Sequence, residues 1–386
     1  MKIKIIYKRP VYSDVVLIYP NAEDIFKKYV FRNFSSQTLD VGTWFSFNPY
    51  VIAKTLKLAL SIKLHFSLNT KNIFVRLLKD LYEKHLQAYI EIINPKYIIT
   101  FIDDSAVFHR LSKNYRKDAA FIAIQNGMRP QSHFKYLLPK PPNPEAVSYI
   151  PNYFCHGHAD VNSFKNGGHH IERYHPIGSL LGGIFWKEIS VKSQKIYDIC
   201  LVSCWVPEGR KDLNENAYEV YKADRKGNEV LEKNLKRLID EKGYSVVIAL
   251  KYDECSEEFN HFYNIFGDDV DYQLSSRKVF STYKAIDKSL LTLTLYSTCA
   301  AEAIGFGKRA LFCNGSGNPA IGIPSAGICY YEGGNYTEFS KRLENILEMP
   351  DNDFKKAMSK NISEIMNYDL YEMPHEYIHR FLIENK

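Results

Sequence analysis

Short, fully apolar runs that alternate with helical segments constrain the fold of this chain more than any other feature. The runs at 97–104 ("YIITFIDD") and 119–127 ("AAFIAIQNG") enclose a helical "SAVFHRLSKNYR". Strands that are apolar on both faces are typical of parallel sheets covered by helices on both sides. A second series of such runs follows at 197–205, 244–251, 289–296 and 309–314. The sequence therefore predicts an α/β protein with two Rossmann-like halves facing a cleft.

A stretch without clear periodicity separates the two series. It covers about 181–196 ("LGGIFWKEISVKSQKI"), and we interpret it as a linker. A chain of 386 residues is also too long for one compact core. The expected domains are 1–185, 186–350, and C-terminal helices over 351–386 that pack back on the first domain.

Composition excludes several classes of protein. The 50 basic and 44 acidic residues are spread along the chain, and no basic tail or nucleic-acid-binding motif is present, so we expect no nucleic-acid partner. The seven cysteines are scattered without a CxxC pair, which indicates a reducing compartment. The start lacks the apolar core of a signal peptide, and no run reaches membrane-span length, so we expect a cytoplasmic protein.

One stretch suggests contact with a membrane surface. Residues 51–66 ("VIAKTLKLALSIKLHF") mix Lys54, Lys57 and Lys63 with aliphatic side chains. A basic amphipathic helix can lie on an acidic leaflet. The alternative is an ordinary helix packed on the sheet with its lysines outward, since the lysines do not gather on one face.

Ligands of open parallel sheets bind beyond the carboxyl ends of the strands, so the residues that follow each apolar run are the candidate site residues. Asp103 and Asp104 end the run at 97–104. A carboxylate there can face the cleft with a raised pKa and act as a general base. We expect one of the two to cap the helix that begins near Ser105 and the other to be available for catalysis.

The turn after the next strand offers polar groups to a ligand. Gln125 and Asn126 precede Gly127, which allows a tight turn or a close approach of backbone to a ligand. Arg129 could meet a phosphate or an acidic sugar. A plain turn is the alternative interpretation of this stretch.

In the second half the informative stretch is 296–315, "YSTCAAEAIGFGKRALFCNG". Ser297 and Thr298 fall where a helix begins, and the free N–H groups and dipole of a helix start favour an anion. Either residue could instead be an ordinary N-cap. Glu302 is misplaced for a capping box, so we expect it to bind sugar or ribose hydroxyls. Ser203 and Lys251 end two other strands of this half and are further candidates for nucleotide binding.

Histidines gather at 155–175, but their spacing matches no standard zinc site, so we expect no metal. His175 in "HPIGS" could contact a phosphate. Gly178 and Ser179 follow it at the expected boundary between the halves. Motifs of dehydrogenases, P-loop NTPases, α/β-hydrolases and zincins are absent from the sequence.

Together, "STCAAEAIGFGKRALF", "FIDD", "IQNG" and "HPIGS" resemble the GT-B glycosyltransferases of bacterial surface-polysaccharide (capsule and lipopolysaccharide) biosynthesis. The resemblance spans most of residues 95–315. It implies a CMP-, UDP-, GDP- or dTDP-linked sugar donor, a glycan or lipid-linked acceptor, possible association with the inner face of the cell membrane, and neither cofactor nor metal.

The resemblance also implies that 1–185 is the acceptor-side domain and that 186–350 binds the nucleotide sugar, and it implies roles for individual residues. Ser297 and Thr298 would contact the phosphate of the donor and Glu302 its hydroxyls, while Asp103 or Asp104 would take the proton of the acceptor hydroxyl. "HPIGS" resembles the His-Pro motif of sialyl- and polysialyltransferases. Those enzymes carry the motif in the donor half, whereas here it ends the first half, which leaves Gly178 and Ser179 as the safer interdomain contacts.

Two alternatives stay open at this point. A polyol-phosphate transferase or a sugar-nucleotide 2-epimerase can use the same two-half architecture, and an epimerase would convert its nucleotide sugar without an acceptor. The chain could also be a catalytically inert sugar- or nucleotide-binding partner in a polysaccharide assembly complex.

Overall fold

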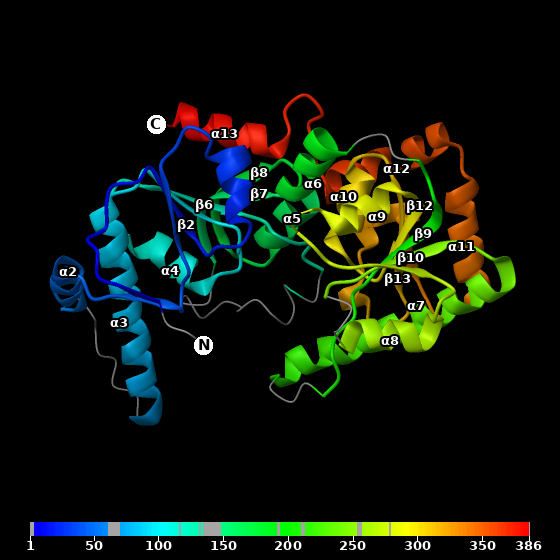
Figure 1. The fold of residues 1–386 in the computed structure, drawn as a ribbon, viewed down its shortest axis with the longest axis horizontal. Helices are drawn as coiled ribbons and strands as arrows, with labels where there is room; N and C mark the ends of the chain where they lie inside the picture. The colour runs from blue at the N-terminus through cyan, green and yellow to red at the C-terminus, as the bar shows by residue number, and fades with distance from the viewer. Residues whose placement is uncertain are drawn as a thin grey trace.

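Two six-stranded sheets organise the molecule (Figure 1). The structure, a computed structural model, describes residues 4–60, 70–115, 117–130, 133, 148–190, 194–209, 213–252, 257–277 and 279–385. The strand orders are β3-β2-β5-β6-β7-β8 and β11-β10-β9-β12-β13-β14, and all neighbouring strands are parallel. The expected α/β fold with two parallel sheets is confirmed.

Within each half, strands and helices alternate along the chain. The strands of the first sheet are β2 (Val15–Ile18), β3 (Ser36–Leu39), β5 (Tyr97–Thr100), β6 (Ala120–Ile124), β7 (Tyr149–Cys155) and β8 (His170–Pro176). Those of the second are β9 (Tyr197–Val202), β10 (Val246–Ala249), β11 (Asp271–Gln273), β12 (Ser289–Thr294), β13 (Arg309–Asn314) and β14 (Tyr330–Glu332).

Helices cover both sheets. The helical segments of the first half are α1 (Glu23–Ile25), η1 (Phe26–Val30), α2 (Pro49–Ala59), α3 (Thr70–Ile93), α4 (Ala106–Asn114), α5 (His158–Asn166), α6 (Leu180–Ile184) and η3 (Phe185–Ile189). Those that follow are α7 (Glu215–Lys242), α8 (Glu257–Phe266), α9 (Ser281–Asp287), α10 (Thr298–Gly305), η4 (Pro319–Ile321), η5 (Pro324–Cys329), α11 (Tyr336–Glu348), α12 (Asp351–Ile365) and α13 (Pro374–Glu384).

Strand β5 shows why its sequence is continuously apolar. Tyr97 and Ile99 pack into the core on one side of the first sheet, and Ile98 packs into the core on the other side. Successive side chains of a strand point to opposite faces, so a strand covered on both faces needs apolar residues at every position.

The C-terminal tail returns to the first sheet. Figure 1 shows α12 beside the second half and α13 beside the first. Ile378 and Leu382 of α13 belong to the same core cluster as Leu17 of β2. The Tyr97 hydroxyl donates a hydrogen bond of 2.7 Å to the Leu382 carbonyl.

Two segments of the first half make contacts that link distant parts of the chain. The stretch expected to be a linker connects the two halves and is helical over α6 and η3. The tail packs closely against Gly182 and Gly183, where an added Cβ would lie 2.3 Å from the Tyr368 hydroxyl and 2.7 Å from Pro374, respectively. Near the start of the chain, β1 (Lys4–Ile6) pairs only with β4 (Trp44–Ser46) among the described strands. Neither contact is visible in local sequence.

Helix α2 covers part of the stretch expected to contact a membrane. Val51 and Thr55 are the buried residues of this helix. Lys54 forms an ion pair of 2.8 Å with Glu91 of α3. Lys63 lies outside the described residues. Within the described part of the chain, no helix has the length and apolar character needed to cross a membrane.

Candidate functional site

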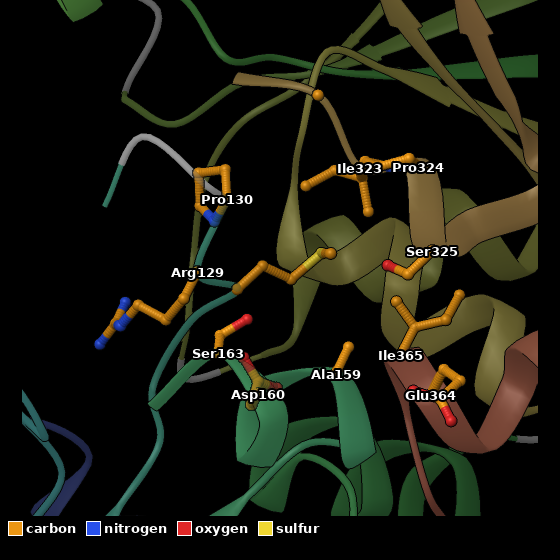
Figure 2. A pocket seen from close by; sticks show the side chains of 12 residues that line it. Arg129, Pro130, Ala159, Asp160, Ser163, Ile323, Pro324, Ser325, Glu364 and Ile365 are labelled. Carbon is orange, nitrogen blue, oxygen red and sulfur yellow. The ribbon is translucent and has the colours of Figure 1, made fainter. Parts of the chain in front are cut away.

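A pocket lies between the two halves at the carboxyl edge of the first sheet (Figure 2). It is bounded by the turn after β6, the first turns of α5, the segment that leads into η5, and the end of α12. Its lining residues are Met128, Arg129, Pro130, Ala159, Asp160, Ser163, Gly322, Ile323, Pro324, Ser325, Glu364 and Ile365. Parallel sheets commonly bind ligands at such an edge, so this pocket is the candidate substrate site.

Asp103 contacts the lining residue Arg129, and its carboxylate has several partners. It forms an ion pair with Arg129, accepts a hydrogen bond of 2.9 Å from the Tyr153 hydroxyl, and accepts a longer one of 3.4 Å from the Asn126 N–H. Burial raises the pKa of Asp103, while the Arg129 guanidinium lowers it. The Asp103 side chain has 0% exposure and is absent from the pocket lining. This arrangement holds the turn after β6 in place.

Asp104 is exposed, and it does not cap α4. The cap is Ser105, whose side chain accepts a hydrogen bond of 3.2 Å from the Phe108 N–H. The expectation that one of the two aspartates caps this helix is therefore wrong. A serine one residue later has the short side chain and extended backbone that an N-cap requires.

The turn at 125–129 is built by its own polar side chains. Gln125 donates to the Gly127 carbonyl at 2.9 Å and accepts from the His156 N–H at 2.9 Å. Asn126 accepts from Arg129 at 3.1 Å. An added Cβ at Gly127 would lie 3.4 Å from Thr298 Oγ1, so this glycine approaches the second half rather than open space.

Sequence reasoning missed Asp160, which lines the pocket from the first turn of α5. Burial raises the pKa of Asp160 to about 7. Hydrogen bonds from Gln125 and Gly157 and the charge of Arg129 act in the opposite direction and lower this pKa. The signal was present in the sequence, because Asp160 follows the apolar strand β7 much as Asp103 follows β5.

In the second half, the hydroxyls of Ser297 and Thr298 at the start of α10 have different hydrogen-bond partners. Ser297 is the N-cap, and its hydroxyl accepts from the Cys299 N–H at 3.3 Å, as the alternative interpretation expected. Thr298 Oγ1 accepts from the Met128 N–H at 2.8 Å. Because Met128 also lines the pocket, this bond joins the start of α10 to the pocket wall.

Glu302 is buried between the halves. It accepts a hydrogen bond from the Ser179 hydroxyl, and burial raises the pKa of its carboxyl. Ser179 caps α6. Gly178 has a φ of 86°, and a Cβ added to it would lie 2.3 Å from the Tyr368 ring. Gly178 and Ser179 therefore make an interdomain contact. Glu302, at 2% exposure, is not among the pocket-lining residues. We expected it to be free for a ligand, but it is bonded to Ser179.

Ser203 and Lys251 are held near Glu258, which is 0% exposed on α8. The Ser203 hydroxyl donates to Glu258, and the Lys251 N–H donates to the same carboxylate at 2.9 Å. The Lys251 side chain is exposed, with its Nζ 3.5 Å from the Trp205 carbonyl oxygen. Ser203 thus orders this loop, while the Lys251 ammonium remains accessible to solvent.

A second buried carboxyl, Asp224 of α7, was also missed. One of its oxygens has no hydrogen-bond partner within the described structure. Burial raises its pKa to about 6, while a hydrogen bond with Tyr296 and the charge of Lys251 lower it. Asp224 sits in the middle of a long helix, so its proximity to the end of β12 was not predictable from local sequence.

The histidines do not converge on the pocket. His175 stacks on Phe154 at 4.4 Å between ring centroids, and its Nδ1 is 3.2 Å from the Tyr377 hydroxyl. Burial lowers its pKa to about 4. It is absent from the pocket lining, whereas the resemblance implied a place near the donor phosphate.

One group in the described part of the chain has metal-ligand proximity: Glu188, His375 and Glu376 offer atoms within 4.8 Å of one another. His375 Nε2 is 3.3 Å from Glu188, and Glu376 accepts from the Met373 N–H at the start of α13 at 2.8 Å. These interactions already tie α13 to η3, and none of the three residues lines the pocket.

Solved structures of the same architecture were found across nearly the whole chain. The UDP-GlcNAc 2-epimerase of Neisseria meningitidis has a TM-score of 0.52 at 12% identity, with 96% of this chain and 98% of that chain covered. The S. aureus MnaA structure with UDP has a TM-score of 0.52 at 16% identity, with 96% and 94% covered. A Listeria monocytogenes protein described as a "putative UDP-N-acetylglucosamine 2-epimerase" has a TM-score of 0.53 at 12% identity, with 99% and 95% covered.

These likenesses show the fold, which is the GT-B architecture of two Rossmann-like domains. A search of curated proteins finds no match. The profile of a family described as "putative O-antigen biosynthesis protein" matches residues 122–379, which is more than half of the chain. The chain therefore belongs to this O-antigen biosynthesis family, within the GT-B proteins of surface-polysaccharide biosynthesis.

Proposed function

We propose that the protein is a glycosyltransferase that moves a sugar from a nucleotide-activated donor to a hydroxyl of a glycan or lipid-linked acceptor. The observation that carries the proposal is the pocket between the halves, lined by residues that follow β6 and β7 on one side and β13 on the other. Family membership supports a role in surface-polysaccharide assembly. Solved structures of the same fold hold UDP or UDP-GlcNAc, which supports a nucleotide sugar as the donor.

The donor is placed in this proposal with its phosphates near the start of α10. The N–H groups and dipole of a helix start stabilise the charge of a departing phosphate without a metal. The Thr298 hydroxyl is bonded to Met128, which lines the pocket. The accessible Lys251 side chain follows β10 at the same edge of the second sheet. In this arrangement Ser297 keeps its capping role.

A panel of ligands tests the donor. CMP, CDP, UDP, GDP, dTDP and their sugars are added to the full chain, and the midpoint of thermal unfolding is measured. We expect one base to stabilise the protein in proportion to the logarithm of its concentration, because a ligand that binds only the folded state shifts the unfolding equilibrium. Stabilisation by none of them would count against the proposal.

A sugar-nucleotide 2-epimerase is the second candidate, since the likenesses with TM-scores above 0.5 described above are to proteins named as such or solved with UDP. Incubation of the stabilising nucleotide sugar without any acceptor separates the two functions. An epimerase converts the sugar of its donor under these conditions. A transferase releases nucleotide efficiently only when an acceptor hydroxyl is supplied.

A lipid-linked acceptor would bring the protein to a membrane surface, and the exposed face of α2 supports this part of the proposal. Tyr50, Leu56 and Leu60 are 60%, 61% and 89% exposed, and Lys57 lies on the same face. We expect the full chain to sediment with vesicles that contain anionic lipid, and Leu56→Glu with Leu60→Glu to reduce this binding by at least severalfold. Equal sedimentation of both proteins would contradict membrane binding through α2.

A further inference from the structure

We propose that Asp160 is the general base of the transfer reaction, accepting the proton of the attacking hydroxyl in the pocket between the halves. This inference rests on the glycosyltransferase function proposed above and deepens it by assigning the proton acceptor. Asp160 lines the pocket, and Figure 2 shows it on the first turn of α5, with Ser325 of the second half and Glu364 of α12 among the other labelled lining residues.

The alternative base, Asp103, is occupied by other contacts. Its carboxylate is paired with Arg129 and bonded to Tyr153 and Asn126, and it has 0% side-chain exposure. Figure 2 shows the Arg129 guanidinium pointing away from the residues that the second half contributes to the pocket. Taking a proton would require Asp103 to give up a buried ion pair, which is costly in a low-dielectric site. Asp160 lies near Asp103 and Arg129, but it also lines the pocket, where a substrate can approach it.

The surroundings of Asp160 suit proton transfer near neutral pH. Arg129 and Asp103 face it from the first half, as do Tyr153 and Cys155 of β7, and the raised pKa of about 7 follows mainly from burial. A base works best when its pKa lies near the working pH, because it is then ionised and still basic enough to take a proton. Glu364 is the other carboxyl among the lining residues.

The step balances as follows. The acceptor oxygen forms a bond to the anomeric carbon while its proton passes to a carboxylate oxygen of Asp160. The bond between the anomeric carbon and the donor phosphate oxygen breaks, and its electron pair leaves with the nucleotide. Asp160 then returns the proton to solvent, so the step needs no oxidant or reductant.

The test compares Asp160→Asn with wild-type full-length protein, using the nucleotide sugar that the panel identifies and a set of simple glycosides as acceptors. We expect kcat to fall by about 10² to 10⁴-fold, the usual contribution of a general base. The KM for the donor should stay within about threefold, since Asp160 acts on the acceptor proton and does not hold the nucleotide. Asp118→Asn, an exposed aspartate just before β6, is the matched control and should leave kcat unchanged.

A pH profile separates catalysis from a structural role. Wild-type kcat should rise with pH through about 7, because only ionised Asp160 accepts a proton, and Asp160→Asn should lose this rise. Asp160→Glu should retain the rise and more activity than Asp160→Asn, and it serves as the test if the asparagine variant does not fold. Turnover retained in Asp160→Asn, or an unchanged pH profile, overturns the assignment. Absence of transfer by the wild-type protein instead overturns the proposed function.

Discussion

The carboxyl edges of the two sheets differ in how their charged groups are held. At the first edge, buried charges contact one another: Asp103 pairs with Arg129, and Asp160 lies beside them. The second edge also holds buried carboxyls, Glu258 and Asp224, but it adds the hydroxyls of Ser297 and Thr298 and the exposed side chain of Lys251. In the function proposed above, the first edge holds the proton-accepting carboxyl among buried charges, which is costly, while the helix start and the ammonium of the second edge suit a phosphate.

The largest effect should come from breaking the buried ion pair of the first edge. Arg129→Met leaves the Asp103 carboxylate buried without its partner, and we expect the free energy of unfolding to fall by about 3–5 kcal/mol. Urea denaturation measures this change. Arg225→Met, which removes surface ion pairs with Glu208 and Glu229, is the matched control and should cost at most about 1 kcal/mol. Equal losses of unfolding free energy in the two variants would mean that the buried pair stabilises the fold no more than the surface pairs do.

A smaller effect is expected where the two edges meet. Thr298→Val keeps the shape of the side chain but removes the acceptor of the Met128 N–H, so the free energy of unfolding should fall by about 1–3 kcal/mol. Affinity for the stabilising nucleotide should also fall, and isothermal titration measures it. Thr337→Val, at an exposed position of α11, should change neither quantity. Unchanged affinity in Thr298→Val would remove this hydroxyl from the proposed phosphate site.

The smallest effect should come from the accessible charge of the second edge. Lys251→Met removes an ammonium that is open to solvent, so stability should hardly change. Nucleotide affinity should fall by about two- to fivefold, corresponding to less than 1 kcal/mol, and the difference should shrink as salt is added. Lys341→Met, an exposed lysine of α11, is the control. A loss of affinity that does not depend on salt would indicate that Lys251 acts through the Glu258 loop instead.

Sequence reasoning found the apolar strands β5, β6, β9, β10, β12 and β13 because their pattern is local. It also pointed to the carboxyl edges, where Ser297 and Thr298 lie. It could not show that Asp103 is neutralised by Arg129, since that pairing joins the ends of two different strands. The assignment of Asp103 and Asp104 as candidate bases followed from position alone, and position does not reveal the partners of a carboxylate.

By itself, the sequence determined the α/β class, the two parallel sheets and the edges at which polar side chains emerge, because periodicity and strand apolarity are properties of neighbouring residues. Only the tertiary structure decided which polar groups are bonded to one another and which face the pocket. Glu302 illustrates the difference: it is misplaced for a capping box in sequence, yet it is bonded to Ser179, which lies in the other half of the molecule. Partners of buried polar groups come from distant segments, and burial makes those partnerships obligatory.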